Sequence, residues 1–139
     1  MKKIFSLNGN EIISALKTEK RQYLCGNLKK AQKLPFFRTD SLEVGITMYD
    51  EKRCDEPHYH TTTEDIIYVL KGTIYIMDIN SKKSETHTDG DIIIIPVNTP
   101  YISKAEADSI VLFVKNPANY DKVVVDVSEM PSIIKWMES

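Results

Sequence analysis

The chain has 139 residues, about the length of one typical domain, so the sequence predicts a single domain over residues 1–139. Apolar residues make up 42% of the chain, and five glycines and six prolines are few, which excludes a disordered or collagen-like protein. The net charge of -2 comes from interspersed charges of both signs, so the chain lacks the basic surface that nucleic acids require and we expect no nucleic-acid partner.

The apolar segments are too short for a membrane protein. After Met1-Lys2-Lys3, the apolar run 4–7 ends at Asn8-Gly9-Asn10, which leaves no secretory signal. The longest apolar runs, 66–70 and 92–97, are far shorter than the roughly 18 to 20 residues of a membrane span. We therefore expect a cytoplasmic protein with no membrane contact.

Two short helices are predicted at the ends of the chain. The first covers about residues 10–18, with Asn10 as its cap and Ile12, Ile13 and Leu16 at helical spacing. The second covers 131–138, where a proline suits the first turn. Residues 17–33 have poor periodicity and predict at most one strand.

The centre of the chain has the pattern of an all-β domain. Residues 42–48 alternate between apolar and other side chains, which predicts a strand. Further strands are predicted over 65–70, 73–79, 91–95, 109–115 and 122–127, with Gly, Asn, Asp and Pro turns between them. Because no helix separates these strands, the sequence predicts an antiparallel β-barrel or sandwich.

Two of the three histidines form the sequence His58-Tyr59-His60. In an extended segment, residues two apart share one face of the sheet, so both imidazoles can bind the same ion. Asp65 shares a face with Ile67 and Val69, whereas Glu64 lies on the opposite face. Either carboxylate can complete a set of two histidines and one carboxylate, which suits iron, manganese, nickel or zinc.

This pattern resembles the cupin superfamily, whose first motif reads G-x5-H-x-H-x3,4-E-x6-G and whose second reads G-x5-P-x-G-x2-H-x3-N. Here His58 and His60 are followed by Asp65 and then by Gly72, and the second motif begins at Gly90. The resemblance covers about residues 42–115. It implies a jelly-roll barrel core there with one site in its mouth, an N-terminal extension over 1–41, and a C-terminal strand and helix over 116–139.

The sequence departs from the family pattern at the ligand positions. Asp65 stands where the family usually has glutamate, and we expect it to point inward as the carboxylate ligand, with Glu64 as the second choice. Asn98 replaces a motif glycine, which is a mild change because asparagine tolerates the left-handed conformation. Tyr101 replaces the fourth ligand, a histidine, and a phenol is a poor ligand for most divalent ions.

Three functional hypotheses follow from the resemblance. In the first, His58, His60 and Asp65 bind a divalent or ferric ion (zinc, iron, manganese or nickel), and the protein isomerises, cleaves, oxygenates or simply binds a small polar metabolite, with Tyr101 moving a proton. In the second, no metal is present, and His60 as base and Tyr101 as acid isomerise or epimerise a keto-sugar nucleotide. In the third, the protein is a non-catalytic sensor or carrier of a ligand or metal.

The predicted strand 65–70 is apolar on both of its faces. Ile67 and Val69 point toward the barrel, and Ile66, Tyr68 and Leu70 point away from it. An exposed apolar face of this kind favours association. We therefore expect a homodimer, with this strand or the N-terminal segment at its interface.

Overall fold

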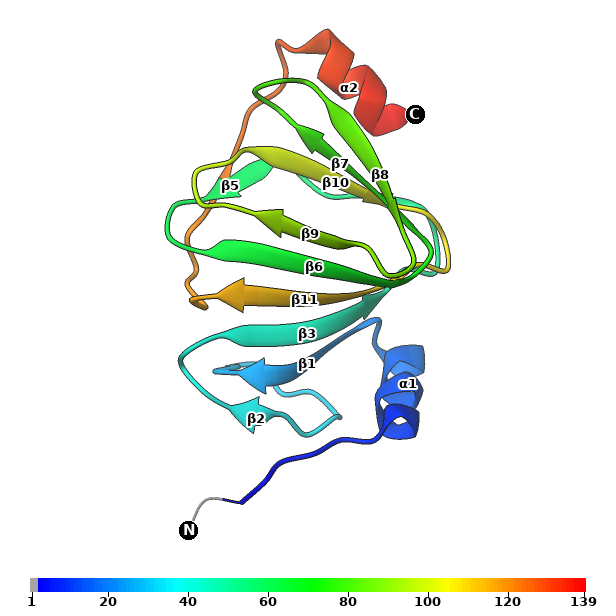
Figure 1. The fold of residues 1–139 in the computed structure, drawn as a ribbon, viewed down its shortest axis with the longest axis vertical. Coiled ribbons are helices and arrows are strands. Elements are labelled where there is room, and N and C mark those ends of the chain that lie inside the picture. The colour runs from blue at the N-terminus through cyan, green and yellow to red at the C-terminus, as the bar shows by residue number, and fades with distance from the viewer. Residues whose placement is uncertain (1–2) are drawn as a thin grey trace.

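The computed structural model describes residues 3–139 and contains two short helices and twelve strands (Figure 1). The helices are α1 (Gly9–Thr18) and α2 (Pro131–Glu138). The strands are β1 (Arg21–Gly26), β2 (Phe37–Arg38), β3 (Glu43–Met48), β4 (Arg53–Cys54), β5 (His58–His60), β6 (Glu64–Lys71), β7 (Thr73–Asp78), β8 (Ser84–Thr88), β9 (Ile92–Ile95), β10 (Tyr101–Ala105), β11 (Ile110–Asn116) and β12 (Lys122–Val124). Residues 1 and 2 of the expected N-terminal extension lie outside the described residues.

The strands form two facing sheets. The first has the order β2-β1-β3-β11-β6-β9, and the second has the order β12-β5-β10-β7-β8 with β4 paired to β10. Within residues 3–139, no hydrogen-bonded strand pair joins the two sheets, so the expected barrel or sandwich consists of two sheets that do not close on each other. The expected antiparallel pairing is present in both sheets, but β1 pairs with β2 in parallel. The predominantly β architecture itself is as predicted.

Most of the predicted strands are confirmed, with small shifts of their ends. The expected strand 122–127 stops at Val124. The polar strand β8 was not predicted, because its sequence, SETHT, has no apolar alternation along an exposed sheet edge. The strand β10 was not predicted either, because Tyr101, Ile102, Lys104 and Ala105 are all buried and the period of two is lost.

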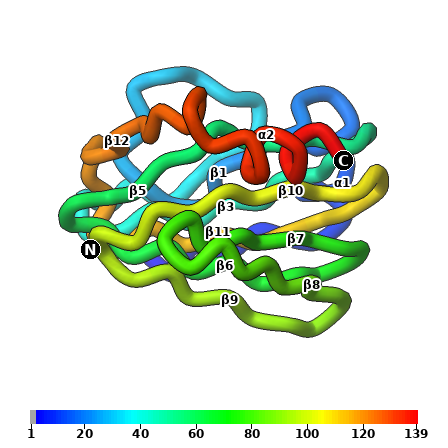
Figure 2. The backbone as a smooth tube through the Cα atoms, turned by 90° about the horizontal axis from the view of Figure 1, so that it is seen from above, coloured from blue at the N-terminus to red at the C-terminus, as the bar shows by residue number. Residues whose placement is uncertain are grey.

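The two helices cover parts of the outer faces of the sheets. The side chain of Asn8, not the expected Asn10, caps α1 by accepting a hydrogen bond from the Glu11 N–H at 2.9 Å, because the helix already begins at Gly9. The helix α2 packs Ile133 against Met77 and Ile102, so it lies over β7 and β10 (Figure 2). Neither helix is long and apolar enough to cross a membrane.

The space between the sheets is part core and part cavity. Seven side chains fill one side of it: Val69, Ile74, Ile93, Ile95, Tyr101, Ala105 and Val111. The remaining space is a cavity of about 490 Å³, which is lined from both sheets and includes His58, Asp65 and Tyr101. His58, Asp65 and Tyr101 are therefore buried side chains that border this cavity.

One part of the outer surface of the first sheet is apolar and uncovered. Cross-strand pairing aligns two rows of side chains over β3, β11, β6 and β9. These rows are Ile46, Leu112, Tyr68 and Ile92, and beside them Val44, Val114, Ile66 and Ile94. Ile92 and Ile94 are 59% and 58% exposed, so the face predicted to be apolar on the outside of the 65–70 strand is present.

The close contact between Gly45 and Phe113 predicts the effect of a single methyl group. A Cβ at position 45 would overlap Phe113 Cζ, lie 2.7 Å from its Cε1 and lie 3.0 Å from the Gln22 carbonyl oxygen. We expect Gly45→Ala to lower the free energy of unfolding by about 1 to 3 kcal/mol, measured by urea denaturation.

The matched control is Gly9→Ala, since a Cβ at position 9 meets nothing within 4 Å. Adding Phe113→Leu to Gly45→Ala should cost less than the sum of the two single changes, because the overlap is relieved. Equal losses for Gly45→Ala and Gly9→Ala would contradict the steric explanation.

Candidate metal site

The strand β5 presents both histidines to the inside. His58 and His60 are buried, and Tyr59 between them is half-buried, as the alternation of a strand requires. Cross-strand pairing sets Tyr101 of β10 opposite His58. The Asn98 N–H donates to the His60 carbonyl oxygen at 2.7 Å, and Asn98 has the left-handed conformation (φ 57°) expected at this position. The loop before β10 thus anchors β5.

The hydrogen bond of His58 fixes which ring nitrogen is free. Nδ1 lies 2.8 Å from the Glu56 carbonyl oxygen, which can only accept, so Nδ1 carries the proton and Nε2 keeps its lone pair. Burial lowers the pKa of His58 below its ordinary value of 6.5, although the bond to Glu56 opposes the shift. At neutral pH, His58 is a neutral imidazole with Nε2 as a potential ligand atom.

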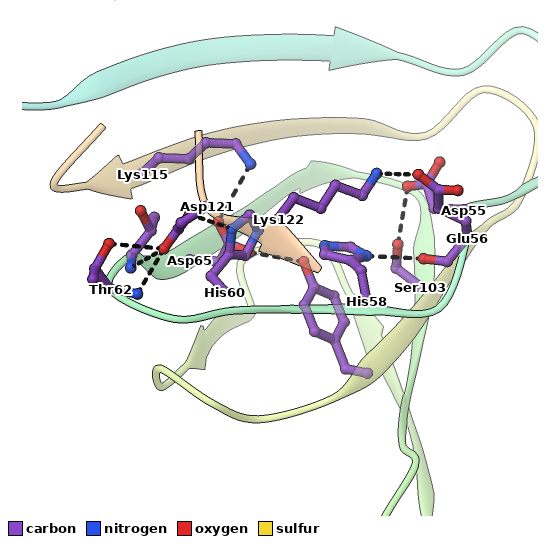
Figure 3. Close-up of polar contacts among 12 residues, drawn as sticks. Asp55, Glu56, His58, His60, Thr62, Asp65, Ser103, Lys115, Asp121 and Lys122 are labelled. Atoms are coloured by element: carbon purple, nitrogen blue, oxygen red, sulfur yellow. Dashed lines mark hydrogen bonds and ion pairs between the residues drawn. The ribbon is translucent and has the colours of Figure 1, made fainter. Parts of the chain in front are cut away.

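His60 is held in the same way by a carboxylate. Its Nδ1 donates to Asp121 Oδ1 at 2.8 Å (Figure 3). Its Nε2 is buried without a hydrogen-bond partner, although Asp65 Oδ2 is only 3.2 Å away. With the proton on Nδ1, a lone pair of nitrogen faces a lone pair of oxygen. A cation between these two atoms removes the repulsion.

Asp65 is the carboxylate that the structure brings to the histidines. It is buried on β6, whereas Glu64 is exposed. Asp65 Oδ2 accepts a hydrogen bond from the Tyr101 hydroxyl at 2.9 Å. Its Oδ1 lies 3.6 Å from Lys115 Nζ (Figure 3). One ligand atom each from His58, His60 and Asp65 lies within 4.8 Å of the other two. A site of this size and donor type fits one metal ion.

Tyr101 lies beside this group as a neutral phenol. Burial and the adjacent Asp65 carboxylate raise the pKa of Tyr101 far above its ordinary value of 10. Its hydroxyl proton is donated to Asp65, and its ring lies 4.7 Å from the His58 ring between centroids. The hydroxyl therefore contacts a candidate ligand and keeps its proton at neutral pH.

Asp121 is a site residue that sequence reasoning missed. Besides the His60 ring, it accepts hydrogen bonds from the Thr62 N–H at 2.6 Å, the Thr62 hydroxyl at 2.8 Å and the Thr63 N–H at 2.8 Å. Burial opposes its ionisation, but these hydrogen bonds, with that of His60, hold the pKa of Asp121 well below 3.8. Because it lies 61 positions after His60, no local pattern could have identified it.

Cationic side chains also line the cavity and were not predicted. Lys115 is the cross-strand partner of Asp65 on β11, and Lys122 is the partner of His60 on β12. Lys122 Nζ forms an ion pair with Glu56 at 2.6 Å. Arg21 of β1 lines the same cavity.

Comparisons with known proteins identify one family by its model and several solved structures of similar fold. The family model for the cupin domain matches residues 46–114. Among solved structures, KdgF from Halomonas sp. is 21% identical, with 72% of this chain and 79% of that chain covered and a TM-score of 0.56. The polyketide cyclase RemF from Streptomyces resistomycificus is 22% identical, with 71% and 70% covered and a TM-score of 0.57.

A third structure, the DMSP lyase DddQ from Ruegeria pomeroyi DSS-3, is 17% identical, with a TM-score of 0.58. The alignment covers 76% of this chain but only 50% of that protein, so the chain corresponds to half of its length. No curated protein matches the sequence significantly. At these identities the structural likeness establishes the fold and no activity.

The four hydrogen bonds of Asp121 predict a large cost for its removal. Asp121→Ala leaves the Thr62 and Thr63 donors and His60 Nδ1 without their acceptor. We expect the free energy of unfolding to fall by about 1 to 3 kcal/mol, measured by urea denaturation of the metal-free protein.

The matched control is Asp126→Ala, because Asp126 is an exposed acceptor for the Ser128 N–H. The free energy of unfolding of that variant should fall by no more than about 0.5 kcal/mol. A loss at Asp121 as small as at Asp126 would show that the His60 side chain needs no support from this carboxylate.

Proposed function

The chain is a member of the cupin superfamily, and we propose that it is a metal-binding cupin in which His58, His60 and Asp65 hold one divalent or ferric ion. The adjoining cavity would receive a small polar metabolite. The observation that carries the proposal is the buried, unpartnered Nε2 of His60, which faces a carboxylate oxygen. A buried nitrogen without a partner costs about 1 to 3 kcal/mol, and a bound cation would remove that cost.

The orientation of both imidazoles supports the same conclusion. His58 Nδ1 is held by a backbone carbonyl and His60 Nδ1 by Asp121, which leaves Nε2 free on each ring. Metal-binding histidines usually have their second nitrogen fixed in this way. The donor set of two imidazoles and one carboxylate suits zinc, iron, manganese or nickel.

A bound ion would supply Lewis acidity toward a carbonyl or carboxylate of the metabolite. Tyr101 is the residue we assign to hold a proton at the site, since its hydroxyl stays protonated and lies on Asp65. Isomerisation, lyase chemistry and dioxygenation all fit this arrangement, as does binding without turnover.

One observation favours a second candidate function. Tyr101 Oη and His60 Nε2 both lie beside Asp65 Oδ2, at 2.9 and 3.2 Å. This pair would serve the metal-free isomerase or epimerase with His60 as base and Tyr101 as acid. In that case chelators leave the turnover rate unchanged, and both His60 and Tyr101 are needed for turnover.

The proposal predicts which carboxylate the metal needs. After treatment with EDTA and removal of the chelator, the protein should bind one Zn²⁺ or Mn²⁺ ion, measured by isothermal titration calorimetry. Asp65→Ala and His60→Ala should each weaken binding by about a hundredfold or more, because one of three protein ligands is lost.

Glu64→Ala is the matched control for Asp65→Ala, since it removes the neighbouring, exposed carboxylate. Its metal affinity should equal that of the wild type. Equal losses in the two variants, or no metal binding by the wild type, would rule out the proposed site and leave the metal-free alternatives.

The partner we propose is a second copy of this chain. Tyr68, Ile92 and Ile94 of the two apolar rows are exposed, although Ile46 at the β3 end is buried, and α2 covers part of the second sheet. A two-fold axis would bury these rows against each other.

We expect a homodimer at micromolar concentration, measured by light scattering after size exclusion. Ile94→Lys should shift it to monomer, because the charge would be buried in the interface. Val124→Lys, at a similarly exposed position (57%) on β12, should leave it unchanged. A monomeric wild type would contradict the dimer.

A further inference from the structure

Arg21 is an exposed cation that lines the cavity and has no ionic partner among the described residues. Its Nε donates to Thr47 Oγ1 at 3.0 Å, and its guanidinium carbon lies 4.9 Å from the centroid of the Phe113 ring. Within residues 3–139, no carboxylate oxygen lies within 4.0 Å of its nitrogens. The terminal N–H groups of this guanidinium therefore remain available to a ligand.

Lys115 is a second cation, and its ammonium group can still donate hydrogen bonds to a ligand. Its Nζ is 3.6 Å from Asp65 Oδ1, which is an ion pair but too long for a hydrogen bond. Lys20 and Arg53 also line the cavity, and Arg53 Nε lies 3.7 Å from Asp55. Two further lysines of the lining are engaged by other groups. Lys122 is bound to Glu56 at 2.6 Å, and the ammonium of Lys104 donates to the Trp136 carbonyl oxygen at the end of α2.

Arg21, Lys115 and two of the candidate ligand residues, His58 and Asp65, line one cavity. Arg21 and Lys115 line it from the first sheet, and His58 and Tyr101 line it from the second. The Lys115 ammonium forms an ion pair with Asp65, which is one of the proposed metal ligands. This ion pair places a cation next to the candidate metal site. A molecule that fills the cavity beside His58 thus also contacts Arg21 and Lys115.

From this arrangement we infer that the small molecule bound in the cavity carries a carboxylate group, which Arg21 and Lys115 bind. A guanidinium presents two parallel N–H groups that match the two oxygens of a carboxylate, and the Arg21 guanidinium also contacts the Phe113 ring. Phosphate sites are commonly built on a helix N-terminus, and neither α1 nor α2 contributes a residue to the cavity. The inference rests on the proposed function in taking this cavity as the ligand site.

The experiment compares succinate with its neutral diamide, succinamide, on the metal-free protein by isothermal titration calorimetry. Succinate should bind measurably more tightly than succinamide. Arg21→Gln should weaken succinate binding about tenfold, and Arg21→Lys should give an intermediate loss, because it keeps the charge but not the fork. Lys17→Gln, an equal charge change on the exposed face of α1, should have no effect.

Separate titrations with Zn²⁺ distinguish this inference from the proposed function. Arg21→Gln should bind Zn²⁺ as the wild type does. If Zn²⁺ does not bind but succinate binding still depends on Arg21, the metal proposal fails and the carboxylate inference stands.

Three results would overturn the inference itself. They are equal affinities for succinate and succinamide, equal succinate affinities in the wild type and Arg21→Gln, and tighter binding of inorganic phosphate than of succinate. Thermal denaturation of each variant checks that it is folded. If Arg21→Gln does not fold, the succinate affinity of Arg21→Lys decides the test.

Discussion

The buried carboxylate of Asp65 is the contact on which the arrangement of this site depends. It extends from the first sheet and is met by Tyr101 and His60 of the second. Within the described residues the two sheets share no hydrogen-bonded strands, so side chains alone join them here. A buried charge costs several kcal/mol unless it is paired, and a hydroxyl donor and the Lys115 ammonium offset part of that cost. A cation between Asp65 and His60 would offset a further part of the cost of burying the Asp65 charge.

The strand register explains why these groups meet. Cross-strand pairs share a face, and the pairs His58 with Tyr101, His60 with Lys122 and Asp65 with Lys115 all point inward. A slip of one residue would turn a whole set of side chains outward. The site is therefore fixed by the same alternation that buries Val69. Nδ1 of His58 is held by the Glu56 carbonyl oxygen, and Nδ1 of His60 is held by Asp121.

The sequence predicts those parts of the fold and site whose pattern is contained within a few neighbouring residues. The spacing of His58 and His60, and the apolar alternation that follows Asp65, are contained within a few residues, and so is the turn at Asn98. The support from Asp121 is not local, because it exists only once β12 has paired with β5. The strand β10 was missed for a related reason, since α2 buries its outer face through Ile102 and erases the alternation.

Two groups of side chains at the cavity differ in what they can determine. The imidazoles and Asp65 form a donor set that could serve several reactions, and KdgF, a DMSP lyase and a polyketide cyclase share this fold at about 20% identity. The strands β1, β3 and β11 supply the second group, which includes Arg21, Thr47 and Phe113. A fold shared so widely does not select a ligand, so the selection must come from side chains that line the cavity outside the donor set. In this chain those side chains combine an unpaired guanidinium with an aromatic surface, and so they favour a flat anion over a neutral molecule.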